Sequence, residues 1–145
     1  HHFALVCRDL AEIAVYAKID NRQFRLLKAA TPGSYTFILQ ATREVPKRLQ
    51  HPSRRTIGLR VPDHKVALAL LAELGEPILS STLLLPGDEA PLNNVDEMRA
   101  RLGQRIDLIV DAGSCGITPT TVVNLTGEAP LITRLGRGST APFGL

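Results

Sequence analysis

Apolar residues along the chain fall into short runs that are separated by turn-forming residues, and this pattern predicts alternating strands and helices. The strand segments are rich in β-branched and aromatic residues and are bounded by Pro, Gly, Asn or Asp. The predicted strands are Phe3–Cys7, Tyr35–Leu39, Thr56–Val61, Ile78–Leu85, Ile106–Val110, Thr121–Leu125 and Leu131–Arg134.

Four helices are predicted where apolar residues recur at helical spacing. Asp9 and Asp20 are placed to cap two short helices, and Asp63 is placed to cap a third that ends at Gly75. The fourth is predicted over Val95–Leu102, before Gly103. The glycine-rich tail, 136–145, is expected to fray.

The interleaving of strands and helices indicates the α/β (α+β) class, with a twisted, mixed and largely antiparallel sheet that is covered by helices. We find no repeat or linker, so a single domain is expected over 1–145. Only His1 and His2 precede the first strand, and no Met begins the chain. We therefore expect the domain to be incomplete at its N-terminus.

Composition places the chain among globular proteins, with 44% apolar and 21% charged residues. The longest apolar run, Val66–Ala72, is far shorter than the about 20 residues that cross a bilayer. Cys7 and Cys115 are too few for a disulfide framework and lack zinc-ligand spacing, and no secretory signal is visible. These features favour a cytoplasmic protein without a structural metal.

The net charge of +3 is a weak signal, but basic residues concentrate between Arg43 and Arg60, where Glu44 is the single acid. Two interpretations remain open, a solvated surface or a surface that binds phosphate or nucleic acid. Aromatic residues make up only 4%, which argues against a platform that stacks bases. The candidate RNA-binding residues are Lys47, Arg48, Arg54 and Arg55.

Standard phosphate-loop, dinucleotide, nucleophile-elbow and zinc-protease motifs are absent from the sequence. Arg60 ends an apolar strand just before a proline, a position that suits a carboxylate or phosphate group, with pairing to a nearby acid as the alternative. Ser81 and Thr82 supply hydroxyls for an anion or for local capping. Thr120 directly precedes the predicted strand Thr121–Leu125, and Arg134 precedes glycines that permit close backbone approach.

Several segments, taken together and in order, resemble landmarks of the YrdC-like domain, the threonylcarbamoyl-AMP synthase family. They are Phe3–Val6, Thr31–Leu39, Thr56–His64, Pro77–Thr82 and Pro119–Leu125. The resemblance covers essentially the whole chain, and Cys7–Leu10 with Leu83–Gly87 is similar to the YciO branch. It implies a YrdC/RibB-like sheet with a positively charged concave face.

The family's synthases join threonine, bicarbonate and ATP, a step in tRNA threonylcarbamoyladenosine modification, and the fold has been linked to double-stranded RNA. The resemblance implies that Arg60 contacts an anionic group, that Thr120 and Arg134 hold the nucleotide, and that Thr82 stands at the serine of a Ser-x-Asn motif. Two departures follow. The family's Lys-x-Arg motif would lie upstream of this sequence, and the motif's asparagine falls on Leu84, whose side chain forms no hydrogen bond.

Three functions are compatible with these features. The first is a YciO-like protein that binds nucleotide, double-stranded RNA or tRNA through its positive surface. The second is a nucleotidyltransferase, an L-threonylcarbamoyladenylate synthase that takes ATP, with magnesium, as substrate. The third is a structural fragment without independent function. Whether the chain is an enzyme and how it oligomerises stay open.

Overall fold

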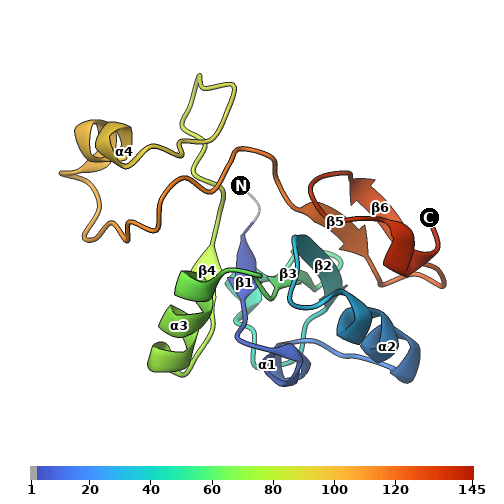
Figure 1. The fold of residues 1–145 in the computed structure, drawn as a ribbon. Helices are drawn as coiled ribbons and strands as arrows, with labels where there is room; N and C mark the ends of the chain where they lie inside the picture. The colour runs from blue at the N-terminus through green and yellow to red at the C-terminus, as the bar shows by residue number, and fades with distance from the viewer. Residues whose placement is uncertain (1–2) are drawn as a thin grey trace. The chain divides into compact units, whose positions relative to one another are not determined.

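The computed structural model describes residues 3–145 (Figure 1). Its helices and strands alternate irregularly along the chain. In chain order they are β1 Ala4–Val6, α1 Leu10–Tyr16, α2 Asn21–Ala30, β2 Tyr35–Gln40, the 3-10 turn Lys47–Leu49, β3 Thr56–Arg60, α3 Lys65–Leu74, β4 Ile78–Ser80, α4 Val95–Leu102, β5 Thr121–Asn124, β6 Leu131–Arg134 and the 3-10 turn Ala141–Phe143.

The described residues form two compact units. Unit 1 runs to Ser81 and resumes at Pro119–Leu145, and unit 2 comprises Thr82–Thr118. All six strands belong to unit 1. The single domain expected from the sequence stays a prediction.

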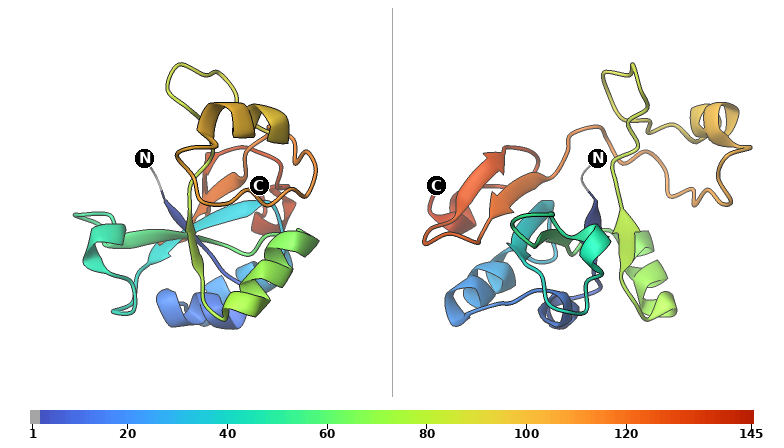
Figure 2. Two further views of the ribbon diagram at one scale, coloured as in Figure 1. Left: turned by 90° about the vertical axis from the view of Figure 1, so that its left-hand side faces the viewer. Right: turned by 180° about the vertical axis from the view of Figure 1, so that it is seen from behind.

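The strands of unit 1 form one mixed sheet in the order β4-β1-β3-β2-β5-β6 (Figure 2). The β1/β4, β2/β3 and β5/β6 pairs are antiparallel, whereas β1/β3 and β2/β5 are parallel. Antiparallel pairs outnumber parallel ones, so the predicted α/β class with a mixed, largely antiparallel sheet is confirmed.

One face of this sheet packs against helices and forms the core. Phe37, Leu59 and Val123 point to this face from the central strands and are completely buried. Ile13 of α1 and Leu27 of α2 belong to the same cluster, so these helices cover that face (Figure 1). Because side chains alternate along a strand, the residues between the core positions lie on the opposite side, called here the second face.

Side-chain caps fix where the first two helices begin, as predicted. Asp9 accepts a hydrogen bond from the Glu12 N–H at 2.9 Å, and Asp20 accepts one from the Gln23 N–H at 2.7 Å. Gln23 in turn accepts from the Asp20 N–H, which completes a capping box, and its Nε2 donates to the Leu125 carbonyl at 2.8 Å. Helix α2 is thereby tied to β5.

The predicted cap of the third helix is wrong by one residue. His64 is the N-cap, and its Nδ1 accepts from the Ala67 N–H at 3.3 Å. Asp63 is exposed and lies outside the helix. The end of the helix agrees with the prediction, since Gly75 adopts the left-handed conformation with φ of 70°.

Two strand predictions are also corrected. The strand expected over Ile78–Leu85 is limited to Ile78–Ser80, because its partner β1 offers only three residues for pairing. It is not a buried strand, since Leu79 is 41% exposed. The segment 106–110 forms no strand at all, and Leu108 is 77% exposed. A unit as small as unit 2 can form little apolar core, and its described residues include no strand with which this segment could pair.

The C-terminal tail packs onto unit 1, contrary to the expected fraying. Phe143 is buried and meets Tyr35 and Phe37 edge-on, with ring centroids 5.5 Å and 6.1 Å away. The Tyr35 hydroxyl donates to the Ser139 carbonyl at 2.7 Å. A few aromatic contacts therefore order a segment whose composition alone predicts disorder.

Candidate functional site

A row of residues crosses four strands on the second face of the sheet. Thr36 on β2 is paired with Val122 on β5, and Val122 is paired with Arg134 on β6. Arg60 on β3 is opposite Thr36, one step beyond the paired Phe37 and Leu59. Residues in register share a face, so Arg60 and Arg134 point to the same side of the sheet. Three strand spacings separate their Cα atoms by about 14 Å, a span comparable to the length of a mononucleotide.

Arg60 is a half-buried cation that forms no ion pair among residues 3–145. Its Nε is buried and has no hydrogen-bond partner. Burial also lowers the pKa of the Arg60 guanidinium from its usual value. The ion pairs found among residues 3–145 all lie elsewhere, so the alternative in which a nearby acid pairs with Arg60 finds no support. An unpaired buried donor is costly and marks a place where an anionic acceptor would be stabilised.

Thr120 and Arg134 form a hydrogen-bonded network with Thr36. The Thr36 and Thr120 hydroxyl oxygens are 2.8 Å apart. Arg134 donates from Nε and Nη2 to the Thr120 carbonyl at 3.1 Å and 2.9 Å, and from Nη2 to Thr120 Oγ1 at 3.0 Å. These bonds hold one edge of the guanidinium, and Nη1 takes part in none of them. The network lies at the N-terminal ends of β2 and β5.

The basic residues between Arg43 and Arg60 form an exposed surface in unit 1. This basic stretch carries four candidate RNA-binding residues, all exposed and none in an ion pair within the part of the chain that the structure describes. They are Lys47, Arg48, Arg54 and Arg55. Arg55 has a φ of 55°, an uncommon conformation that turns the chain into β3.

Comparison with known proteins identifies the family. A family described as telomere recombination, named for the Sua5, YciO and YrdC proteins, matches residues 1–136. The chain belongs to the Sua5–YciO–YrdC family. The resemblance inferred from the sequence is thereby confirmed.

Relatives in this family place the chain near YciO. An uncharacterized protein of Haemophilus influenzae is 56% identical over 144 residues, covering 99% of this chain and 70% of the relative. The uncharacterized protein YciO of Escherichia coli K12 is 50% identical over 143 residues, covering 99% and 69%. Threonylcarbamoyl-AMP synthase of Bacillus subtilis is 33% identical over 112 residues, covering 77% of this chain and 32% of the relative.

Solved structures in the Sua5–YciO–YrdC family share the fold. The crystal structure of E. coli YciO superposes with a TM-score of 0.93 at 50% identity, covering 99% of this chain and 69% of that one. Sua5 of P. abyssi complexed with L-threonine gives a TM-score of 0.83 at 24% identity, covering 94% and 40%. At that identity the second likeness concerns the fold alone.

The remaining site candidates, Ser81 and Thr82, lie outside the strands that carry the row. Ser81 is exposed and follows β4 at the end of the first segment of unit 1. Thr82 and Leu84 belong to unit 2, where the Leu84 N–H donates to the Thr82 carbonyl at 2.9 Å. The Leu84 side chain is 43% exposed. A role for Ser81 and Thr82 in binding stays a prediction.

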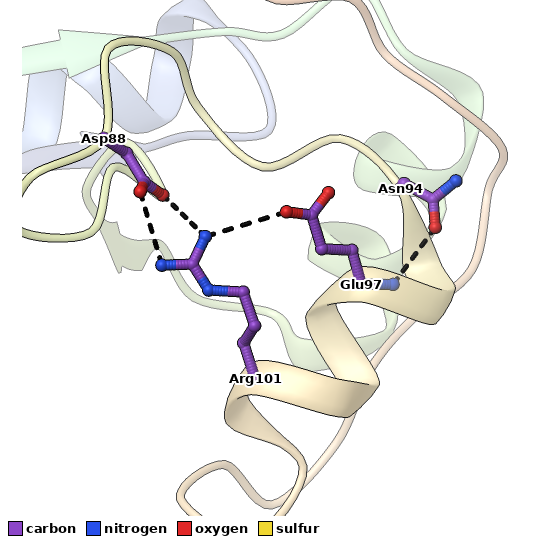
Figure 3. Close-up of polar contacts among 4 residues, drawn as sticks. All are labelled: Asp88, Asn94, Glu97 and Arg101. Atoms are coloured by element: carbon purple, nitrogen blue, oxygen red, sulfur yellow. Dashed lines mark hydrogen bonds and ion pairs between the residues drawn. The ribbon is translucent and has the colours of Figure 1, made fainter.

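Unit 2 has its own polar framework around α4 (Figure 3). Arg101 donates to both carboxylate oxygens of Asp88, at 2.8 Å and 3.3 Å, and lies 3.7 Å from Glu97. These bonds to Asp88 raise the pKa of Arg101. The Asn94 side chain caps the helix by accepting from the Glu97 N–H at 3.1 Å. The arrangement pins the loop around Asp88 to the last turn of α4.

Residues 3–145 contain neither a candidate metal site nor a candidate membrane span. Their His, Cys, Asp and Glu side chains nowhere gather in a group of three or more that could hold a metal ion. Among the same residues, none of the helices has the length and apolar character that crossing a membrane requires.

Thr36 was missed by the sequence analysis. Its signal was present, because Thr36 alternates with the buried Tyr35 and Phe37 and so places a hydroxyl on the second face. What the sequence did not reveal is that β2 pairs in parallel with β5, which brings this hydroxyl to Thr120.

Proposed function

We propose that the chain binds a nucleotide on the second face of the sheet, with Arg60 and Arg134 contacting its anionic groups. The observation that carries this proposal is the buried Arg60 Nε without a partner. A phosphate or carboxylate oxygen placed there supplies the missing acceptor and offsets the desolvated charge. Thr36 and Thr120 offer hydroxyls between the two guanidinium groups for the sugar or base.

Calorimetric titration of the chain with ATP and Mg²⁺ tests the proposal. Changing Arg60→Met or Arg134→Gln removes a hydrogen bond to a charged group, and each is expected to weaken ATP binding at least about tenfold. Arg25→Gln is the matched control, since Arg25 is exposed on α2, a helix that covers the core face of the sheet. Equal affinity in all four proteins would refute the assignment.

The competing function is that of an L-threonylcarbamoyladenylate synthase, a name that the B. subtilis relative carries. This activity predicts pyrophosphate release that requires threonine, bicarbonate and ATP together. Leu84 argues against it, because leucine leaves any buried polar group of the ligand unpaired at about 1–3 kcal/mol. The binding proposal therefore expects ATP binding with little turnover, and fast threonine-dependent turnover would replace it with the synthase.

Changing Leu84→Asn separates loss of activity at this position from loss elsewhere. If the asparagine of the family motif is what this chain lacks, Leu84→Asn gains threonine-dependent pyrophosphate release over the wild type. Leu83→Asn is the matched control, because it introduces the same side chain one position away. A gain in both variants, or in neither, would show that Leu84 does not decide the activity.

A second candidate function, binding of duplex RNA, is favoured by the basic stretch. Exposed cations without ion pairs are available to neutralise phosphates, and duplex RNA is recognised mainly through its backbone and shape. The contact would be independent of base sequence, since aromatic residues are only 4% of the chain. It would involve the basic stretch rather than Arg60 and Arg134.

Charge reversal tests the RNA contact. Arg48→Glu with Arg54→Glu should weaken binding for every duplex sequence and lower the slope of log affinity against log salt by about one per lost phosphate contact. Lys18→Glu with Arg25→Glu is the matched control, since it makes the same charge change at exposed positions on the helical side. If the two double variants lose affinity equally, only net charge matters and the basic stretch is no RNA site.

A further inference from the structure

The Thr121 hydroxyl ties β5 to the chain segment that follows β6. It is completely buried, donates to the Gly138 carbonyl at 2.7 Å and accepts from the Gly136 N–H at 2.9 Å. Between these glycines, the Arg137 N–H donates to the Pro119 carbonyl at 2.9 Å. We call these three hydrogen bonds the Thr121 clasp. They hold residues 136–138 beside residues 119–121.

The two glycines of the clasp sit where no side chain fits. A Cβ atom on Gly136 would collide with the carbonyl oxygens of Pro119 and Thr120, and one on Gly138 would collide with the Tyr35 ring. The backbone of the segment therefore lies directly against the Pro119–Thr121 backbone. This close approach explains why the sequence is glycine-rich here, where composition alone predicted fraying.

The Thr121 clasp lies on both sides of the Thr120 carbonyl, which accepts hydrogen bonds from Arg134. Arg134 donates to the Thr120 carbonyl, which lies between Pro119 and Thr121, the two β5-side members of the clasp. Strand pairing alone holds this position weakly, because the β5/β6 register shifts between Val122 and Val123. Side-chain packing does little to hold Arg134 in place, because the next residue, Leu135, is 72% exposed.

We propose that Thr121 is a positioning residue. Its hydroxyl holds the Thr120 carbonyl where the Arg134 guanidinium can donate to it, and so directs Nη1 of Arg134 toward an anionic ligand. This inference rests on the proposed nucleotide site and deepens it. Thr121 itself touches no ligand, because its side chain is buried on the core face while Arg134 and Thr36 lie on the second face. Thr121, which is buried in the core, thereby positions the exposed cation of Arg134.

The test compares Thr121→Val, which keeps the shape and removes the hydroxyl, with Thr121→Ser, which keeps the hydroxyl. Two quantities are measured well below the unfolding transition: hydrogen exchange of the Arg134 Nε–H by NMR, identified by its loss in Arg134→Gln, and affinity for ATP. In Thr121→Val the Nε–H should exchange at least about tenfold faster and ATP should bind about tenfold more weakly. Thr121→Ser should match the wild type in both.

The outcomes separate this inference from the proposed function. Unchanged Nε–H protection in Thr121→Val overturns the positioning role, and so does equal loss in Thr121→Ser. If the wild type binds no ATP while Thr121→Val still loses Nε–H protection, the nucleotide site fails and the positioning of Arg134 stands. Protection that fails in Thr121→Val without loss of ATP affinity removes Arg134 from the site.

A measurement on the wild type covers the case in which Thr121→Val does not fold. Exchange of the Arg134 Nε–H and of the Gly136 N–H, which donates to Thr121, is followed at rising urea concentration. If the clasp seats Arg134, both groups lose protection at the same urea concentration. Arg134 protection that outlasts that of Gly136 overturns the inference.

Discussion

The hydroxyl oxygens of Thr36 and Thr120 lie 2.8 Å apart, although the two residues are separated by 84 positions in the chain. Neither residue would indicate a functional site by itself. Their meeting depends on the parallel pairing of β2 with β5. Since Arg134 also donates to Thr120 Oγ1, the pair joins three strands on the second face.

Removing the Thr36 hydroxyl should weaken this network without disturbing the core. Thr36→Val preserves shape and β propensity, so the free energy of unfolding in urea is expected to fall by only about 0.5–1.5 kcal/mol, the value of one hydrogen bond. Affinity for ATP should fall with it. Thr133→Val is the control, because Thr133 is exposed on β6, and an equal effect there would show that Thr36 has no particular role.

Arg60→Met should separate stability from binding. Methionine fills much of the same space and leaves no buried donor unpaired, so the free energy of unfolding of the ligand-free chain is expected to rise by about 1 kcal/mol. Affinity for ATP should fall over the same change, the trade-off expected of a functional residue. A drop in stability comparable to that of losing a core side chain would instead assign Arg60 a structural role.

The Cys7 thiol should make the fold sensitive to alkaline pH. Burial, with smaller contributions from Glu12 and Asp9, raises its pKa from 9.0 to about 12. The folded state thus holds the proton more tightly than the unfolded state. The stabilisation is complete below pH 9 and is lost as pH rises toward 12, by about 1.4 kcal/mol per pH unit.

Comparison with Cys7→Ala isolates this effect from other groups that titrate at high pH. The free energy of unfolding of the wild type should fall relative to that of Cys7→Ala between pH 9 and 11, measured by urea denaturation. Cys115→Ala is the control, because Cys115 is exposed. Profiles of wild type and Cys7→Ala that run parallel across this range would contradict the prediction.

Phe143→Ala should destabilise unit 1 far more than a change at the end of a frayed tail. The ring is buried against Tyr35 and Phe37, and truncation of a buried Phe costs about 3–5 kcal/mol. Leu145→Ala is the matched control, since Leu145 is 64% exposed and its truncation should change stability by less than about 0.5 kcal/mol. Small effects in both variants, measured by thermal unfolding, would restore the picture of a frayed tail.

Local chemistry was sufficient for much of the fold. Short apolar runs rich in β-branched and aromatic residues located β2, β3 and β5, and the N-caps Asp9 and Asp20 begin their helices as predicted. The order of landmark segments identified the family, which the comparison confirms. Arg60 and Arg134 were singled out because each ends an apolar strand, and that signal is contained within a few neighbouring residues.

Tertiary structure decided the features that depend on a partner. Segment 106–110 has an apolar pattern but no adjacent strand, so it remains irregular, whereas β4 ends where β1 stops offering hydrogen bonds. His64 rather than Asp63 caps α3, because the backbone entering the helix decides which side chain reaches the free N–H groups.

The sequence by itself determined where most of the helices and strands form, since periodicity and capping act over a few positions. Only the tertiary structure decided that Thr36 meets Thr120 and that Thr121 holds the segment carrying Gly136 and Gly138. The reason is that a hydrogen bond needs its partner within about 3 Å. Strand pairing between distant segments sets that distance, and no local pattern encodes which strands will pair.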